Sequence, residues 1–221
     1  YDHFMLKEIF EQPSTIQDCL RGRLDASAGT ITMSGIQNNI EQIKNANRIM
    51  ILACGTSWHA GLVAEYVIEE LCRIPVEVEY ASEFRYRNPI VNKGDVIIAI
   101  SQSGETADTL VAIETAKSKG AIILGVVNVV GSSIARASHG GAYTHAGPEI
   151  GVASTKAFIT QLVALALLAL EVGRAKGMNA ERYRDAVREL ELLPAAIQRV
   201  LALDDQIKLM AQSFADKHHA L

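Results

Sequence analysis

Two short segments rich in hydroxyl residues and glycine have the composition of an anion-binding site. The first consists of Cys54, Gly55, Thr56 and Ser57. The second consists of Ser101, Gln102, Ser103, Gly104, Glu105 and Thr106. Hydroxyl and backbone N–H groups are uncharged donors, and several that converge on one point can replace the water around a phosphate without a buried lysine. These two segments are therefore our candidate phosphate site.

Helix capping is the alternative explanation for these hydroxyl residues, because Ser and Thr are favoured at helix N-termini. One hydroxyl on each segment would satisfy that role. Together the segments hold five hydroxyl residues, two glycines and a glutamine, which exceeds the need for caps, so we favour a ligand. Glu105 is expected to have a structural role at its turn or at a backbone amide, because an inward carboxylate would face a like-charged phosphate.

A third segment of small residues precedes the most apolar part of the chain. It consists of Glu149, Ile150, Gly151, Val152, Ala153, Ser154, Thr155 and Lys156. Its small side chains would let the backbone approach a ligand lying over a sheet. Taken alone, however, the segment is better explained by Ser154 or Thr155 capping a helix and by a solvated Lys156.

Other chemistries are disfavoured by what these segments lack. The second segment has no lysine before its Ser or Thr, as a nucleotide hydrolase loop requires, and the first lacks the three-glycine dinucleotide fingerprint. Cys54 has no assignable histidine partner, so we interpret it as a pocket-lining residue. His139 and His145 lack a third ligand at metal spacing, as does the pair His218 and His219, and we expect structural or surface roles for them.

The candidate segments must be positioned by the elements around them. Short apolar runs alternate with amphipathic stretches, which predicts a parallel sheet covered by helices on both faces. The expected strands are residues 48–53, 76–80, 96–100, 121–127 and, more weakly, 142–145, with helices over 57–71, 107–119 and 132–137. The predicted fold is α/β, a five-stranded, parallel, doubly wound sheet of flavodoxin-like order. Ligands of such sheets bind beyond the carboxyl ends of the strands, where both candidate segments would lie.

Additional helices are expected before and after the sheet. Apolar residues at helical spacing predict two short helices over residues 3–24, interrupted by Pro13. A loop over 25–35 and a helix over 36–46 would lead into the first strand. After the fifth strand, 149–172 should pass from a loop into a long apolar helix.

Periodicity predicts that the rest of the chain, from residue 180 to 221, is helical as well. We therefore divide the chain into an N-terminal linker segment (1–35), a central α/β domain (36–175) and C-terminal helices (176–221).

Composition narrows the class of protein. The chain has 221 residues, a formal net charge of -4 and a hydrophobic content of 49%, enough to bury a core without disulfides or metal. Duplex nucleic-acid binding is disfavoured because it needs clustered Lys and Arg. Three dispersed cysteines and no visible signal peptide favour a reducing cytoplasm. The most apolar stretch, 162–170, is shorter than the roughly 20 residues of a membrane span, so we expect a buried helix and no membrane association.

The three segments together resemble the sugar isomerase (SIS) family of domains, and more narrowly the first half of the isomerase region of the glutamine–fructose-6-phosphate aminotransferases. The opening residues 3–13 also resemble the linker that precedes this region. The resemblance implies that a sugar phosphate is the ligand, and it implies no metal and no organic cofactor. Its phosphate would be held by Ser101, Gln102, Ser103 and Thr106, with further contacts from Thr56 and Ser57. Its sugar would be lined by Cys54, Gly55, Val152, Ala153 and Ser154.

The resemblance also implies what lies elsewhere. In that family a glutaminase domain precedes this region and a second SIS domain follows it, and the acid–base residues belong to the second domain or its tail. We therefore expect no catalytic residue within this chain, partnership with those two domains, and a homodimer. Two alternatives remain: a non-catalytic sugar-phosphate sensor, which would ordinarily carry a basic helix-turn-helix, and a different SIS-type sugar-phosphate isomerase, which would need its own base and histidine.

Overall fold

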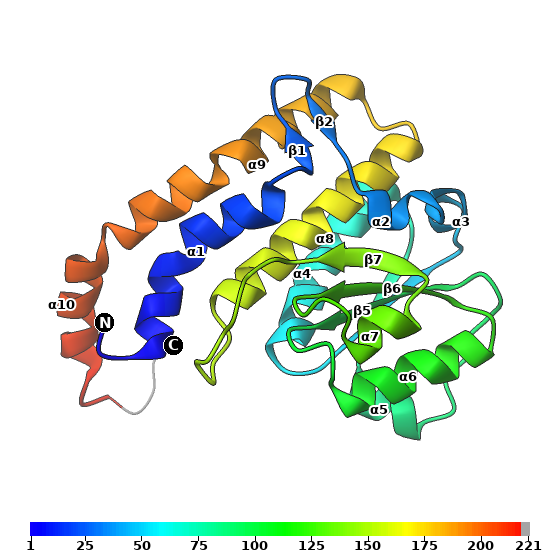
Figure 1. Ribbon diagram of the computed structural model, residues 1–221, viewed down its shortest axis with the longest axis horizontal. Helices are drawn as coiled ribbons and strands as arrows, with labels where there is room; N and C mark the ends of the chain where they lie inside the picture. Colours follow the sequence, from blue (N-terminus) through cyan, green and yellow to red (C-terminus); the bar gives the residue numbers. More distant parts are fainter. Residues whose placement is uncertain (218–221) are drawn as a thin grey trace.

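Five parallel strands form the central sheet of the structure, a computed structural model that describes residues 1–217 (Figure 1). They are β3 (Ile49–Ala53), β4 (Val76–Tyr80), β5 (Val96–Ser101), β6 (Ile122–Val127) and β7 (Gly140–Tyr143). Their order in the sheet is β4-β3-β5-β6-β7, and every neighbouring pair is parallel. This confirms the predicted five-stranded, doubly wound α/β fold.

Helices cover both faces of this sheet (Figure 1). One face packs against α4 (Thr56–Cys72) and α8 (Lys156–Ala175), and the other against α5 (Ala81–Tyr86), α6 (Ala107–Ser118) and α7 (Ser133–Ala137). Since side chains alternate along a strand, Ile49 and Ile51 belong to the first core, and Met50 and Leu52 to the second.

The strand order reverses between β3 and β5. The chain runs from β3 outward to β4 on one side, and then returns to β5 on the other side of β3. Leu52 pairs with Ala99, so Cys54 and Ser101, two residues further on each strand, leave the sheet at the same edge. Both candidate turns therefore flank the topological switch point, where open α/β sheets bind ligands.

The prediction of two short helices broken at Pro13 was wrong. A single helix, α1 (Phe4–Leu20), runs through the proline. Proline cannot donate to the carbonyl four residues earlier, which here is that of Ile9. The Gln12 side chain donates to the Ile9 carbonyl instead, at 2.9 Å, and so replaces the missing backbone bond.

Residues 24–46 also differ from expectation. The predicted loop contains a short antiparallel hairpin, β1 (Leu24–Asp25) and β2 (Thr30–Ile31). The predicted single helix over 36–46 is instead two, α2 (Ser34–Gln37) and α3 (Ile40–Lys44). The break lies at two asparagines, which are weak helix formers.

Two further corrections concern α5 and β7. Helix α5 begins directly after β4 and was not predicted, because six residues are too few for a clear periodicity. Strand β7 begins two residues earlier than expected, at Gly140. Gly141 pairs with Gly125 and its φ is +143°, and a Cβ there would lie 1.9 Å from the Gly125 carbonyl oxygen. The start of β7 was not predicted because glycine lacks the β-branched side chains that are typical of strands.

The long apolar helix α8 lies in the core. It meets the length and composition required to cross a membrane, but 78% of its apolar window is buried inside the protein. It packs on α4 and α1, as the expectation of a buried helix required. The C-terminal region is helical as predicted, with α9 (Ala180–Leu201) and α10 (Asp204–Phe214). The pair His218 and His219 lies outside the described residues.

Candidate functional site

The first turn joins β3 to α4 and exposes backbone as well as hydroxyl groups. Gly55 adopts φ +58° and ψ -134°, a conformation that favours glycine, and a Cβ there would meet no atom within 4 Å. Thr56 is exposed and begins α4. Ser57 is buried, and its hydroxyl accepts a hydrogen bond of 3.0 Å from Nε2 of Gln161 on α8. The turn thus presents Thr56 openly and fixes Ser57 against the core.

The second turn joins β5 to α6 and folds its hydroxyl groups onto one another. Ser101 is 3% exposed, and its Oγ lies 3.0 Å from Thr106 Oγ1 while accepting from the Gly104 amide. The Ser103 hydroxyl accepts from the Glu105 amide. Gly104 has φ +68°, and a Cβ there would lie 2.0 Å from the Ser132 hydroxyl. Only glycine therefore allows this turn to close against the start of α7.

The hydroxyl residues of these turns do not serve as helix caps. Gly55 and Thr106 occupy the N-cap positions of α4 and α6, and neither helix has a side-chain cap hydrogen bond. The first four amides of a helix have no partner within it, and two such helix ends meet at one edge of the sheet. Together with a positive helix-dipole end, this arrangement is suited to an anion.

Glu105 has the structural role that was expected of it. Its Oε1 accepts from the Ser133 backbone amide at 2.8 Å, at the beginning of α7. The contacts with Ser133 hold the pKa of the Glu105 carboxyl below its ordinary value. The carboxylate is therefore engaged with a helix N-terminus beside the turn.

The third segment, between β7 and α8, is organised differently from the prediction. The carboxylate of Glu149 accepts from the amides of Thr155 and Ala157 and from the Ser154 hydroxyl, so it performs the capping expected of Ser154 or Thr155. Lys156 is 5% exposed and not solvated, because its Nζ lies 2.7 Å from Glu11 Oε2. Neither contact was predicted, because Glu149 lies 6 positions before Thr155 and Glu11 lies 145 positions before Lys156.

Val152, Ala153 and Ser154 are not joined to the two turns by any hydrogen bond among residues 1–217. Val152 is fully exposed at the tip of its loop, and Ala153 is exposed beside it. The structure thus brings the first two segments together, and it leaves the third on a separate loop.

A cavity of about 700 Å³ adjoins the second turn. Of the predicted site residues it includes Gln102 alone; the other lining residues are Asp18, Arg21, Asn128, Val129, His145, Gly147 and Pro148. Sequence reasoning missed this lining. Asn128 and His145 follow strands β6 and β7, so their position at strand ends was a usable signal. Asp18 and Arg21 lie on α1, and nothing local in the sequence indicates that α1 reaches this edge.

His139 has a structural contact, whereas His145 lines the cavity described above. Nδ1 of His139 accepts from the Ile123 amide at 2.9 Å, which ties β6 to the start of β7. Burial, with a smaller effect of Arg23, holds the pKa of His145 below its ordinary value. Within residues 1–217 no three His, Cys, Asp or Glu side chains are grouped as metal ligands would be.

Comparison with known proteins gives one consistent family. The sequence model of the SIS domain matches residues 42–171. The chain is 55% identical over 220 residues to a glutamine–fructose-6-phosphate aminotransferase (isomerizing) of Bacteroides thetaiotaomicron, and 53% identical over 221 residues to that of Chlorobaculum tepidum. These alignments cover 99% and 100% of this chain but 36% of each relative.

A solved structure resembles the whole described fold. The C-terminal domain of glucosamine-fructose-6-phosphate aminotransferase from Francisella tularensis superposes with a TM-score of 0.93 at 40% identity. The superposition covers 99% of this chain and 61% of that one. The chain therefore spans a part of the length of each of these relatives.

Proposed function

Because this chain belongs to the SIS domain family, we propose that it binds the phosphate of a hexose 6-phosphate at the turns that follow β3 and β5. The observation that carries the proposal is their position: two turns with hydroxyl groups and two helix N-termini flank the switch point of one sheet edge. Neutral donors in such a place compensate a phosphate charge without a lysine.

The proposed roles follow from the place of each group at the sheet edge and from the resemblance to the SIS family. Ser101, Gln102, Ser103 and Thr106 hold the phosphate, and Thr56 and Ser57 contact it from the first turn. The mutual contact of Ser101 and Thr106 at 3.0 Å holds the two hydroxyl oxygens side by side. Cys54, Gly55, Val152, Ala153 and Ser154 line the sugar.

We further propose that the chain is the first SIS domain of an enzyme that makes glucosamine 6-phosphate from fructose 6-phosphate and glutamine. Its partners are then a glutaminase domain, a second SIS domain and a second copy of the chain, and its compartment is the cytoplasm. The residues 1–35, 36–175 and 176–221 are proposed as linker, sugar-phosphate domain and connecting helices.

Proton transfer in this enzyme is proposed to depend on residues outside the chain. Moving a proton between C1 and C2 of a sugar needs a general base. The nearby charged candidates are all engaged: Glu105 with the Ser133 amide, Glu149 with the start of α8, and Lys156 with Glu11. None of the three is placed as a free base over the two turns.

The double variant Ser101→Ala with Thr106→Ala tests the phosphate site. We expect it to lose the rise in melting temperature that fructose 6-phosphate gives the original chain, since ligands stabilise only the state that binds them. The matched control is Thr115→Ala with Ser118→Ala, which removes two hydroxyls at the far end of the same helix. Circular dichroism checks that both variants fold. An undiminished shift in the folded Ser101/Thr106 variant would remove these residues from the site.

A further inference from the structure

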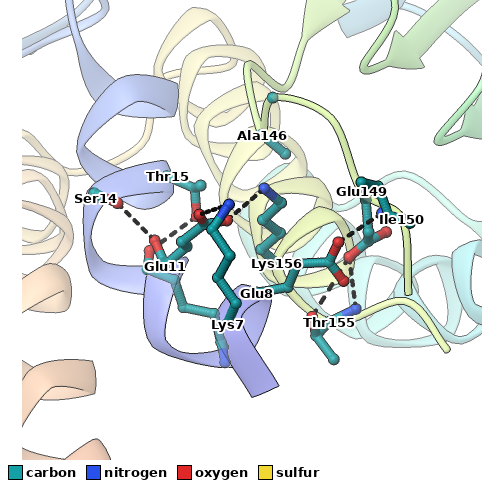
Figure 2. A network of polar contacts seen from close by, with 12 residues as sticks. Lys7, Glu8, Glu11, Ser14, Thr15, Ala146, Glu149, Ile150, Thr155 and Lys156 are labelled. Carbon is teal, nitrogen blue, oxygen red and sulfur yellow. Dashed lines mark hydrogen bonds and ion pairs between the residues drawn. The ribbon is translucent and has the colours of Figure 1, made fainter. Parts of the chain in front are cut away.

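The loop between β7 and α8 is tied to a helix that is remote in sequence (Figure 2). The carboxylate of Glu8, on α1, accepts from the amide of Ile150 at 2.6 Å and from that of Gly151 at 3.1 Å. These residues are separated from Glu8 by 142 and 143 positions. Helix α1 precedes residues 42–171, which the SIS family model matches, so this anchor comes from outside the matched domain.

Glu8 is committed to this contact. It is 3% exposed, and within residues 1–217 it forms no ion pair. Both nearby lysines, Lys7 and Lys156, pair with Glu11 instead. A buried carboxylate is costly unless hydrogen bonds compensate it, and here the two backbone amides of the loop provide that compensation. The loop conformation and the burial of Glu8 therefore depend on each other.

Gly151 makes the close approach possible. A Cβ at this position would lie 2.5 Å from Oε2 of Glu8 and 3.3 Å from Cα of Met5. Any larger residue would displace the carboxylate of Glu8, and Met5 of α1 would have to yield slightly. The close packing of the Glu8 carboxylate against the loop therefore requires glycine at position 151.

The loop is held again just beyond its tip. Glu149 binds the amides of Thr155 and Ala157 and the hydroxyl of Ser154. Val152 and Ala153 lie between the two anchored points and project into solvent. Restricting both ends of so short a segment fixes where its tip can lie.

We propose that Glu8 is a positioning residue, which fixes residues 150–154 so that they meet the sugar part of the bound ligand. The inference rests on the proposed sugar-phosphate function. A loop ordered before binding loses less entropy when the ligand arrives. The phosphate, held by the two turns on other elements, does not depend on this anchor. Glu8 therefore contributes to recognition of the sugar and not of the phosphate.

Other contacts also hold α1 against the rest of the protein, so the effect of Glu8 on the loop is separable from folding. Ile16, Cys19 and Leu20 of α1 are buried in the first core, and Glu11 pairs with Lys156. Removing the Glu8 carboxylate should leave this helix in place.

The test compares two ligands in two variants. Affinities for fructose 6-phosphate and for inorganic phosphate are measured with the original chain, Glu8→Ala and Gly151→Ala. The first variant removes the carboxylate, and the second displaces it while keeping its charge. Glu114→Ala is the control, because Glu114 is an exposed carboxylate on α6 without a hydrogen bond in residues 1–217. We expect fructose 6-phosphate to bind about tenfold more weakly to both loop variants, with phosphate binding unchanged.

Faster hydrogen exchange of the 150 and 151 amides in Glu8→Ala would accompany this result. Equal weakening of both ligands, or no weakening of either, in folded variants would overturn the positioning role. If Glu8→Ala does not fold, Gly151→Ala decides. Failure of the proposed function looks different, because the original chain would then bind neither ligand, and the inference would fall with it.

Discussion

At the scale of single residues, the chemistry of this chain depends on how polar groups are engaged. The hydroxyl groups of the two turns do not cap the helices that follow them. The charged residues near them are bound by backbone amides or by each other. Lys156 is an example: although lysines are rarely buried, this one is 5% exposed beside Glu11.

The pair of Glu11 and Lys156 should affect acid stability. The hydrogen bond from Lys156, aided by Lys7 and opposed by burial, holds the pKa of the Glu11 carboxyl below its ordinary value. A lowered folded-state pKa gives stability that is fully present above the ordinary pKa and is lost as the pH falls through the lowered value. We expect Glu11→Gln to destabilise the chain at neutral pH, on the order of 3 kcal/mol because a buried lysine loses its partner.

Urea unfolding from neutral pH down to pH 3 measures this effect. The difference between the original chain and Glu11→Gln should shrink as the solution becomes more acidic. A difference that stayed constant over this range would show that the pair carries no such linkage.

At the scale of elements, α8 connects the core to the site. It packs on α4 and α1, its Gln161 holds Ser57 of the first turn, and its beginning carries Lys156. Helix α10 is different, since it has no buried residue.

This contrast gives a matched pair of substitutions. Leu168→Ala, at a residue that is 0% exposed on α8, should lower the free energy of unfolding by about 2 to 5 kcal/mol because it leaves a cavity. Leu209→Ala, at a residue that is 68% exposed on α10, should change it by less than about 0.5 kcal/mol. Chemical denaturation of both variants measures the difference, and similar losses would contradict the assignment of α8 as the core helix.

At the scale of the whole molecule, the fold gathers hydrogen-bond donors at one edge of the sheet. The sheet edge supplies donors, and the charged candidates for proton transfer are engaged elsewhere. This is the distribution expected of a domain that binds a substrate whose reaction is completed by other parts of a longer protein.

We therefore predict that this polypeptide alone forms no measurable glucosamine 6-phosphate from fructose 6-phosphate and ammonia, although it binds the sugar phosphate weakly. The assay is a chromatographic measurement of the amino sugar after prolonged incubation, with an intact enzyme of the same family as positive control. Product formed by the chain alone would place a base within residues 1–221 and refute the proposed division of labour.

The sequence by itself determined the sheet and the two turns. Apolar runs, helical periodicity and the residues that follow each strand are local features, and parallel strands necessarily end at one edge. These features alone place Cys54 and Ser101 at the same edge of the sheet. The start of the glycine-rich strand β7 and the six-residue helix α5 were not predicted, because their local sequence patterns are weak.

Only the tertiary structure decided how α1 takes part in the site. Pro13 lies inside a helix because the Gln12 side chain replaces a lost bond, and Asp18 and Arg21 reach the cavity. Glu8 meets Ile150 across 142 positions, and Glu11 meets Lys156 across 145. Such contacts have no local signature, since a carboxylate on a helix has the same sequence pattern whether it faces water or a distant loop. Packing alone determines its partner.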